Sequence, residues 1–256
     1  MVAAIIVAAG RGRRMGGRIP KQYLRLKGLP LLGHSLHAFD RCPQITRICL
    51  VVPPHDRDFC RRDILGALKL RRPVEVIGGG DRRQDSVYRG LQALQGDCLQ
   101  SSRGEAGEPE VPPECDGIVL IHDGVRPFVS PSQIAECIRG AREMGACIPA
   151  VAAADTLKQA GGDGLVTGTI ARDGVWLAQT PQAFRFSLIL RAHESARREG
   201  VRGTDDALLV ERLGSPVKIV TGSRLNIKIT HSEDLSLARA ILDAQQTPED
   251  PRAPGK

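Results

Sequence analysis

Five short apolar runs recur along the chain, and they alternate with helical patterns. The first of them, VAAIIVA over residues 2–8, has no polar side chain on either face. The other runs cover residues 45–53, 73–80, 117–124 and 146–155. A strand that is apolar on both faces is typical of a parallel sheet that helices cover on both sides. The alternation therefore predicts an α/β fold with a mostly parallel sheet flanked by helices.

Helices are predicted between these runs and after them. The first ones cover residues 31–41, 83–94 and 131–144. A last helix, at about 231–243, has Thr230 and Glu233 at the spacing of a capping box. Another helix is predicted to open at Thr204, whose hydroxyl suits an N-cap, with two aspartates in its first turn.

We expect these elements to form one domain over residues 1–243. The GGDG turn at 161–164 predicts a β-hairpin, so residues at about 152–175 are expected to project from the sheet as an arm that can serve in dimerisation. Residues 96–116 are rich in Gly, Pro, Glu and Ser and show no apolar period, which predicts a mobile surface insertion. Residues 244–256 are expected to be a disordered tail.

The composition narrows the classes of partner. The net charge of +7 indicates an anionic partner, such as nucleic acid, a phosphorylated metabolite or a nucleotide. Aromatic residues make up only 3% of the chain, which argues against a single-stranded nucleic-acid platform, because such platforms stack bases on aromatic rings. The seven cysteines include no CxxC pair, so we expect buried free thiols rather than a zinc site or a disulfide framework.

The apolar runs do not indicate a membrane protein. None of them has the length of a membrane span. The run at residues 2–8 lacks the basic start of a signal peptide, since its arginines follow it. We therefore expect a cytoplasmic protein without a membrane partner.

The loop AAGRGRRMGGRIPK at residues 8–21 directly follows the first run. Ligands of open parallel sheets bind beyond the carboxyl ends of the strands. Gly10 and Gly12 allow close approach of the backbone to a ligand, and a triphosphate would suit the cations of this loop, which are Arg11, Arg13, Arg14, Arg18 and Lys21. The loop matches neither a Walker motif nor a dinucleotide fingerprint, in which glycine would replace Met15. A solvated basic turn or a nucleic-acid patch is the alternative.

A second glycine-rich segment, GGGDRRQDS at residues 78–86, follows the third run. Its glycines allow a base or a ribose to lie against the main chain, and Asp81 and Ser86 can offer hydrogen bonds. The alternative is an ordinary helix start, in which Asp85 and Ser86 are first-turn residues.

Two further residues stand out for their charge. Asp123 ends an apolar strand, where a carboxylate needs a metal, a hydroxyl or a cation as its partner. A plain ion pair with Arg126 is the alternative, and the preceding His122 is interpreted as a packed residue rather than a ligand. Lys228, within NIKIT at 226–230, alternates with two isoleucines and should point away from their face, which is also typical of a solvated edge.

Together these segments resemble one known family. The motifs that carry the resemblance are AAGRGRRMGGRIPKQYL, GGGDRRQDSV, HDGVRPF, DTLK, RDGVWLAQTPQAF, GTDDALLVE and NIKIT. They occur in the order seen in 2-C-methyl-D-erythritol 4-phosphate cytidylyltransferases of the non-mevalonate isoprenoid pathway. The resemblance covers about residues 2–242, apart from segment 96–116, which is longer than usual. It implies a homodimer with a Rossmann-like nucleotidyltransferase fold, in which the hairpin arms are exchanged, and cytidylyl transfer from CTP to the sugar phosphate.

The resemblance also implies roles for individual residues. The catalytic cations are Arg14, Lys21 and Lys228. The CTP contacts are Ala8, Ala9, Gly10, Gly12, Gly80, Asp81, Ser86, Asp123 and Gly124. The acceptor contacts are Arg126, Thr156, Arg172, Thr180 and Thr204. Thr156 and Arg172 would lie on the arm and act from the partner subunit, whereas helix capping is the alternative for Thr204. Mg²⁺ is expected as the cofactor, held mainly by the CTP phosphates with Asp123 as its protein ligand.

The implied reaction is an in-line attack by an acceptor phosphate oxygen on the α-phosphorus of CTP. The acceptor phosphate has a second pKa of about 6, so it needs no general base near neutral pH. Positioning and preorganised cations should therefore supply most of the rate. One alternative is a cytidylyltransferase for another polyol phosphate, such as ribitol 5-phosphate. The other is a nucleic-acid-binding protein that uses the basic 11–21 loop, which would leave the remaining loops without a role.

Overall fold

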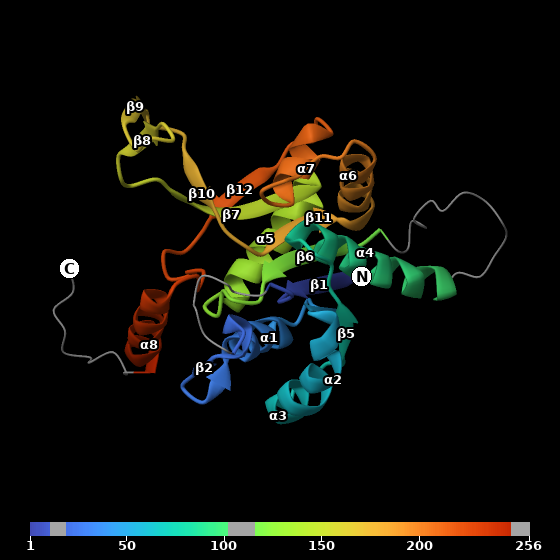
Figure 1. Ribbon diagram of the computed structural model, residues 1–256. Helices are drawn as coiled ribbons and strands as arrows, with labels where there is room; N and C mark the ends of the chain where they lie inside the picture. Colours follow the sequence, from blue (N-terminus) through green and yellow to red (C-terminus); the bar gives the residue numbers. More distant parts are fainter. Residues whose placement is uncertain (11–18, 102–115, 247–256) are drawn as a thin grey trace.

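The computed structural model describes residues 1–10, 19–101 and 116–246. An eight-stranded sheet forms the centre of this part of the chain, in the order β10-β7-β11-β6-β1-β4-β5, with β12 beside β7 (Figure 1). Its strands are β1 (Val2–Val7), β4 (Arg47–Val52), β5 (Val74–Gly78), β6 (Ile118–Asp123), β7 (Ala146–Ala152), β10 (Trp176–Ala178), β11 (Gln182–Arg185) and β12 (Lys218–Thr221). All five predicted strands are confirmed.

The sheet is mostly parallel, as predicted. Strands β5, β4, β1 and β6 are parallel neighbours, and β12 runs parallel to β7. Strand β11 lies antiparallel between β6 and β7, and β10 is antiparallel to β7. Because β1, β5 and β6 run in one direction, their carboxyl ends meet at one edge, where Val7 pairs with Asp123.

Helices cover both faces of the sheet. Those on the first face are α1 (Leu31–Arg41), α5 (Pro131–Met144) and the continuous helical segment α2 (Arg57–Phe59), η4 (Cys60–Leu65) and α3 (Gly66–Leu68). Those on the second face are α4 (Arg83–Ser101), α6 (Phe186–Arg198) and α7 (Ala207–Arg212). Helix α8 (Ser232–Gln246) stands apart from both layers, beside a small hairpin of β2 (Arg25–Leu26) and β3 (Leu29–Pro30) (Figure 1).

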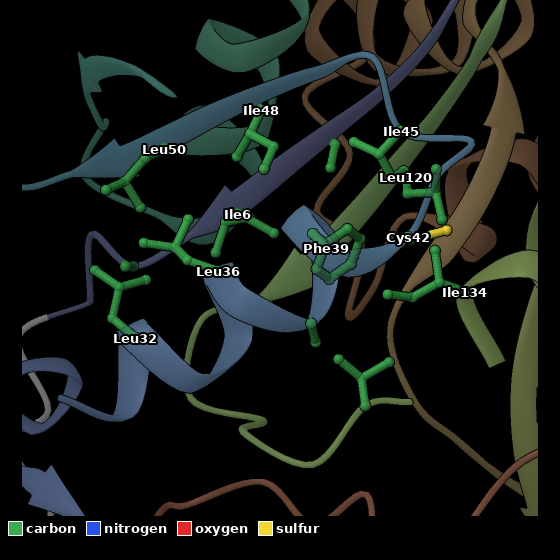
Figure 2. Close-up of a cluster of buried hydrophobic side chains, with 14 of the residues drawn as sticks. Ile6, Leu32, Leu36, Phe39, Cys42, Ile45, Ile48, Leu50, Leu120 and Ile134 are labelled. Carbon is green, nitrogen blue, oxygen red and sulfur yellow. The ribbon is translucent and has the colours of Figure 1, made fainter. Parts of the chain in front are cut away.

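The alternation of side chains along the strands builds the two cores. On the first face, Leu36 and Phe39 of α1 pack against Ile6 of β1 and Leu120 of β6 (Figure 2). On the second face, the neighbouring Ile5 packs against the buried side of α4. Both faces of β1 are therefore buried, which explains why its sequence is apolar throughout.

Predicted helix boundaries agree closely except at the carboxyl ends of α4 and α8 and at the start of α7 (Ala207–Arg212). Helices α1 and α5 match their predicted ranges, 31–41 and 131–144. Helix α4 continues to Ser101, so the predicted insertion at 96–116 begins within a helix, and residues 102–115 lie outside the described part. Residues 244–246 of the predicted tail still belong to α8, and residues 247–256 lie outside the described part as well.

Two predicted helix caps are wrong in detail. Helix α7 begins at Ala207, and the carboxylate of Asp205, not the hydroxyl of the exposed Thr204, accepts a hydrogen bond from the N–H of Leu208 at 3.0 Å. The second wrongly predicted cap is that of the last helix. Because α8 begins at Ser232, its third residue is Asp234, and this side chain rather than Glu233 accepts from the backbone N–H groups of Thr230 and His231.

The predicted hairpin arm is confirmed. Strands β8 (Leu157–Ala160) and β9 (Val166–Ile170) pair antiparallel to each other and project from the main sheet (Figure 1). The turn between them closes with a hydrogen bond from the N–H of Gly161 to the carbonyl oxygen of Leu165. Gly164 has a φ of +79° there, a conformation that favours glycine.

The described cysteine side chains are buried, as the sequence predicts. The buried cysteines that form no disulfide are Cys42, Cys49, Cys60, Cys137 and Cys147. No helix within the described ranges combines the length and the apolar composition that a membrane crossing requires.

Candidate active site

One pocket of about 270 Å³ lies at the carboxyl edge of the sheet. Its lining comes from five separate stretches of the chain: the end of β1 with the residues after it, the end of β6 with the residues after it, the β5–α4 junction, the short helix η2 (Lys21–Tyr23), and the loop that carries Lys228. The predicted site residues that line it are Ala8, Ala9, Gly10, Lys21, Gly80, Asp81, Ser86, Asp123 and Lys228. Segments that are distant in sequence thus converge on one cavity.

Asp123 is the charged centre of this pocket. Its Oδ1 accepts from Arg83 Nε at 2.9 Å, and its Oδ2 pairs with Lys228 Nζ at 2.7 Å. Burial raises the pKa of Asp123, but the positive charges of Arg83 and Lys228 outweigh burial and hold the pKa well below its usual range. The carboxylate is therefore ionised at neutral pH.

The two predicted lysines approach the pocket from different loops. Lys21 follows Pro20 in η2, and its Nζ donates to the carbonyl oxygen of Ile229 at 3.1 Å. Lys228 lies in an extended loop in which Ile227 and Ile229 pack into a small apolar cluster, so its side chain points the opposite way, as predicted. The alternative, a solvated lysine at the edge of the sheet, does not account for the ion pair between Lys228 and Asp123. That ion pair identifies Lys228 as a pocket residue.

The glycine-rich loop after β5 packs closely against the rest of the pocket. The N–H of Gly80 donates to Ser86 Oγ at 3.1 Å, and that hydroxyl donates to the carbonyl oxygen of Arg82 at 3.0 Å. A side chain on Gly79 would clash with Ala9 and would lie 2.8 Å from Ser86 Oγ. Glycine at this position therefore allows the loops after β1 and β5 to meet.

We predict that Gly79→Ala destabilises the protein by about 1–3 kcal/mol, because the added methyl group overpacks this junction. Urea unfolding followed by circular dichroism measures the change. Gly66→Ala is the matched control, since it is exposed, helical and has no atom within 4 Å of an added Cβ. Equal stability of the Gly79→Ala variant and the wild type would show that the two loops do not pack as described.

Several predicted residues lie beside the pocket rather than in its lining. The N–H of Gly124 donates to the carbonyl oxygen of Val7 and so joins the ends of β6 and β1. Thr180 Oγ1 accepts from the N–H of Asp123 at 3.1 Å and contacts His122 Nδ1 at 3.0 Å. His122 is fully buried and burial lowers its pKa to about 4, which confirms it as a neutral packed residue.

Arg126 is not the ion-pair partner of Asp123 that the sequence suggested as an alternative. Its Nη1 donates to the carbonyl oxygen of Asn226 at 2.7 Å, which ties the segment after β6 to the Lys228 loop. The cations that pair with Asp123 are Arg83 and Lys228. The partners differ because α4 and the Lys228 loop, rather than the segment directly after β6, face the carboxylate.

The remaining predicted acceptor contacts do not line the pocket. Thr156 directly precedes β8 and Arg172 closely follows β9, which places both at the base of the arm. Both side chains are exposed. Arg172 Nη1 donates to the carbonyl oxygen of Ala154 at 2.6 Å. Thr204 is exposed before α7. Gly12 and Arg14 lie outside the described residues.

The sequence analysis missed Arg83 and the role of Asp206. Arg83 lines the pocket and bridges two carboxylates, with its Nη1 2.7 Å from Asp206 Oδ2. Both residues stand in first-turn or capping positions of helices, where charged side chains are ordinary. Their only sequence signal is that each belongs to a motif of the resemblance, namely GGGDRRQDSV and GTDDALLVE.

The described residues contain no cluster of three or more His, Cys, Asp or Glu side chains that could enclose a metal ion. Asp123 and Asp81 are nevertheless in the pocket lining. One or two carboxylates together with substrate phosphates are the usual environment of Mg²⁺. The residues therefore fit a magnesium ion that a bound triphosphate brings with it.

Comparisons with known proteins agree with this geometry. The model of the family described as "IspD: 2-C-methyl-D-erythritol 4-phosphate cytidylyltransferase" matches residues 2–101 and 109–244. The residues left unmatched between these ranges, 102–108, belong to the segment 96–116 that the sequence predicts to be an insertion. A protein named 2-C-methyl-D-erythritol 4-phosphate cytidylyltransferase from Pelotomaculum thermopropionicum is 45% identical, with 96% of this chain and 95% of that protein covered. Its namesake from Geobacillus kaustophilus is 46% identical, with 93% and 96% covered.

A solved structure gives the same relationship. The crystal structure of 4-diphosphocytidyl-2C-methyl-D-erythritol synthase from Anaerococcus prevotii superposes with a TM-score of 0.75 at 34% identity, and the match covers 94% of this chain and 96% of that one. The mostly parallel sheet flanked by helices is thus the fold of this group. The chain belongs to the 2-C-methyl-D-erythritol 4-phosphate cytidylyltransferase family.

Proposed function

We propose that the protein transfers the cytidylyl group of CTP to 2-C-methyl-D-erythritol 4-phosphate, forming 4-diphosphocytidyl-2-C-methyl-D-erythritol and pyrophosphate. The observation that carries the proposal is the convergence of Lys21, Lys228, Asp123 and the glycine-rich loop after β5 on one pocket. The names of the relatives at 45% and 46% identity support the same nucleotide and acceptor.

Binding of CTP would use the backbone as well as the charges. Gly10 after β1 and Gly80 after β5 both line the pocket, so their backbone can approach a ligand closely. We assign Gly80, Asp81 and Ser86 to the cytosine and Asp123 to the ribose. The further proposed CTP contacts are Ala8, Ala9, Gly10, Gly12 and Gly124. The triphosphate would then lie toward Lys21, Lys228 and Arg14.

The chemical step would be an in-line attack of an acceptor phosphate oxygen on the α-phosphorus. The new P–O bond forms as the bond to the β-phosphate breaks, and the pyrophosphate leaves with the electron pair. His122 is buried and neutral and is hydrogen-bonded on both ring nitrogens, which makes it unsuited to act as a base. Lys21, Lys228 and Arg14 would stabilise the charge that develops on the phosphate oxygens.

Mg²⁺ would be the cofactor, held mainly by CTP phosphates, with Asp123 as the pocket carboxylate available to it. When bound, it neutralises charge on the phosphates and helps to orient the α-phosphorus. Two side chains of the pocket would respond to the bound nucleotide. Lys228 would leave Asp123 Oδ2 and approach the α-phosphate, and Asp123 would remain ionised beside Arg83.

We further propose a homodimer in which the arm of one subunit reaches the pocket of the other. The arm exposes apolar side chains that no contact within the described subunit covers fully, notably Leu165, Val166 and Ile170. Trp176 and Leu177 of β10 extend this exposed surface toward the sheet. Thr156 and Arg172 would contact the acceptor from the partner subunit, beside Arg126, Thr180 and Thr204.

Turnover tests the proposal directly. Purified protein is incubated with CTP and Mg²⁺ and with 2-C-methyl-D-erythritol 4-phosphate or ribitol 5-phosphate, and pyrophosphate release is recorded. We expect release with CTP and the methylerythritol phosphate, and much less when ATP, GTP or UTP replaces CTP. A preference for ribitol 5-phosphate would reassign the acceptor. Salt-sensitive RNA or DNA binding without CTP consumption would refute the enzyme function.

A further inference from the structure

A chain of charged side chains leads from the pocket into the second core. Lys228 pairs with Asp123, Asp123 pairs with Arg83, and Arg83 Nη1 pairs with Asp206 Oδ2 at 2.7 Å. Asp206 Oδ1 in turn contacts His193 Nε2 of α6 at 3.1 Å. The series of contacts therefore ends on His193, which does not line the pocket and is completely buried.

Asp206 is built into the protein rather than placed at its surface. It is only 1% exposed, and a buried carboxylate is stable only when it is paired and hydrogen-bonded. Its backbone N–H donates to Gln182 Oε1 at 3.0 Å, so that β11 fixes the start of α7. Burial raises the pKa of Asp206, but Arg83 and His193 together hold the pKa below its ordinary value. Asp206 thus presents a fixed negative charge to Arg83.

The two cations on Asp123 are held differently. Arg83 binds Oδ1 and is tied to Asp206 at its other end, whereas Lys228 binds Oδ2 and is 38% exposed. Because they use different oxygens, Lys228 can leave Asp123 without disturbing Arg83. Loss of Arg83 would leave Lys228 as the remaining cation on Asp123, and the attraction between that pair would then oppose its departure.

We propose that Arg83 and Asp206 are positioning residues for the transfer reaction: Asp206 holds Arg83 on Asp123, and this pairing releases Lys228 to the triphosphate. The inference rests on the proposed function, because that function assigns Lys228 to the triphosphate. It assigns no contact with substrate to Asp206, which acts through Arg83.

A double-mutant cycle separates this role from a merely structural one. The variants are Arg83→Gln, Lys228→Ala and the double variant, measured as kcat with CTP, Mg²⁺ and methylerythritol phosphate. We expect Arg83→Gln to lower kcat roughly 10- to 100-fold in the wild-type background. In the Lys228→Ala background the same substitution should lower kcat less than about 3-fold, because its effect passes through Lys228.

Asp206→Asn provides a second, independent arm of the cycle, since it keeps the side-chain volume and removes the charge. The same coupling to Lys228→Ala is expected, and this variant replaces Arg83→Gln should that protein fail to fold. Arg197→Gln is the matched control. Arg197 also links α4 and α6, through an ion pair with Asp85 at 3.5 Å, but it does not line the pocket, and its loss should leave kcat within about 2-fold of wild type.

The outcomes are distinguishable. Wild-type turnover of Lys228→Ala would overturn the proposed role of that lysine, and with it the function assigned to the pocket. A large loss in Lys228→Ala combined with equal fold-losses from Arg83→Gln in both backgrounds would overturn the positioning role alone. An equal loss in Arg197→Gln would also overturn it, because general loosening of α4 would then account for the effect.

Discussion

Lys21→Ala is expected to lower turnover roughly 10²- to 10³-fold, the scale of losing one preorganised donor from a site where charge develops. Lys21 lines the pocket, and its Nζ is held by the carbonyl oxygen of Ile229, next to Lys228. Its position is therefore prepared before any substrate binds. Loss of its charge should act on the developing charge of the departing pyrophosphate, and so reduce kcat more than it raises the KM for CTP.

Steady-state kinetics of purified Lys21→Ala tests this expectation. Circular dichroism and thermal unfolding establish that the variant is folded. Lys218→Ala is the control, because it removes a lysine from a surface ion pair with Glu143, and such pairs contribute little to stability. Wild-type kcat in a folded Lys21→Ala protein would contradict a catalytic role.

Arg172→Ala is expected to raise the KM for the acceptor by about 10- to 150-fold, the equivalent of about 1.5–3 kcal/mol for a hydrogen bond to a charged group. Arg172 is exposed at the base of the arm and its Nη1 donates to the carbonyl oxygen of Ala154. It does not line the pocket of its own subunit. A contact with the acceptor phosphate from the partner subunit would therefore leave the KM for CTP nearly unchanged.

The comparison of the two KM values carries this test. Lys158→Ala serves as the control on the same arm, since its Nζ donates to Thr169 Oγ1 at 2.7 Å within the hairpin. We expect that variant to change neither KM by more than about 2-fold. Equal increases in both KM values for Arg172→Ala would refute the acceptor contact.

The architecture was predictable where burial determines the sequence pattern. Strand β1 is covered on both faces, so its apolar run is continuous. Helix α5 has a clear start, because Ser130 Oγ accepts from the N–H of Gln133 and Pro131 occupies the first turn. Strand β11 was not predicted, since it is only four residues long and begins with the buried polar Gln182.

The pocket was predictable from local signals but its internal pairings were not. Glycines at a strand end marked Gly80, the cluster of cations after the first strand marked Lys21, and alternation with two isoleucines marked Lys228. All three residues line one cavity. The partners of Asp123 depend on which elements face it after folding. Arg83 and Asp206 are 123 residues apart, and no local pattern shows that two first-turn charges will pair. Tertiary contact decides such cases.

The central claim is that cations from distant stretches of the chain act on a single triphosphate at the carboxyl edge of the sheet. A crystal structure of the protein with CTP and Mg²⁺ tests it most directly. We predict that the triphosphate lies in the pocket, with Nζ of both Lys21 and Lys228 within ion-pair distance of its oxygens and with Asp123 still paired to Arg83. A triphosphate bound elsewhere, or one that contacts neither lysine, would contradict the account.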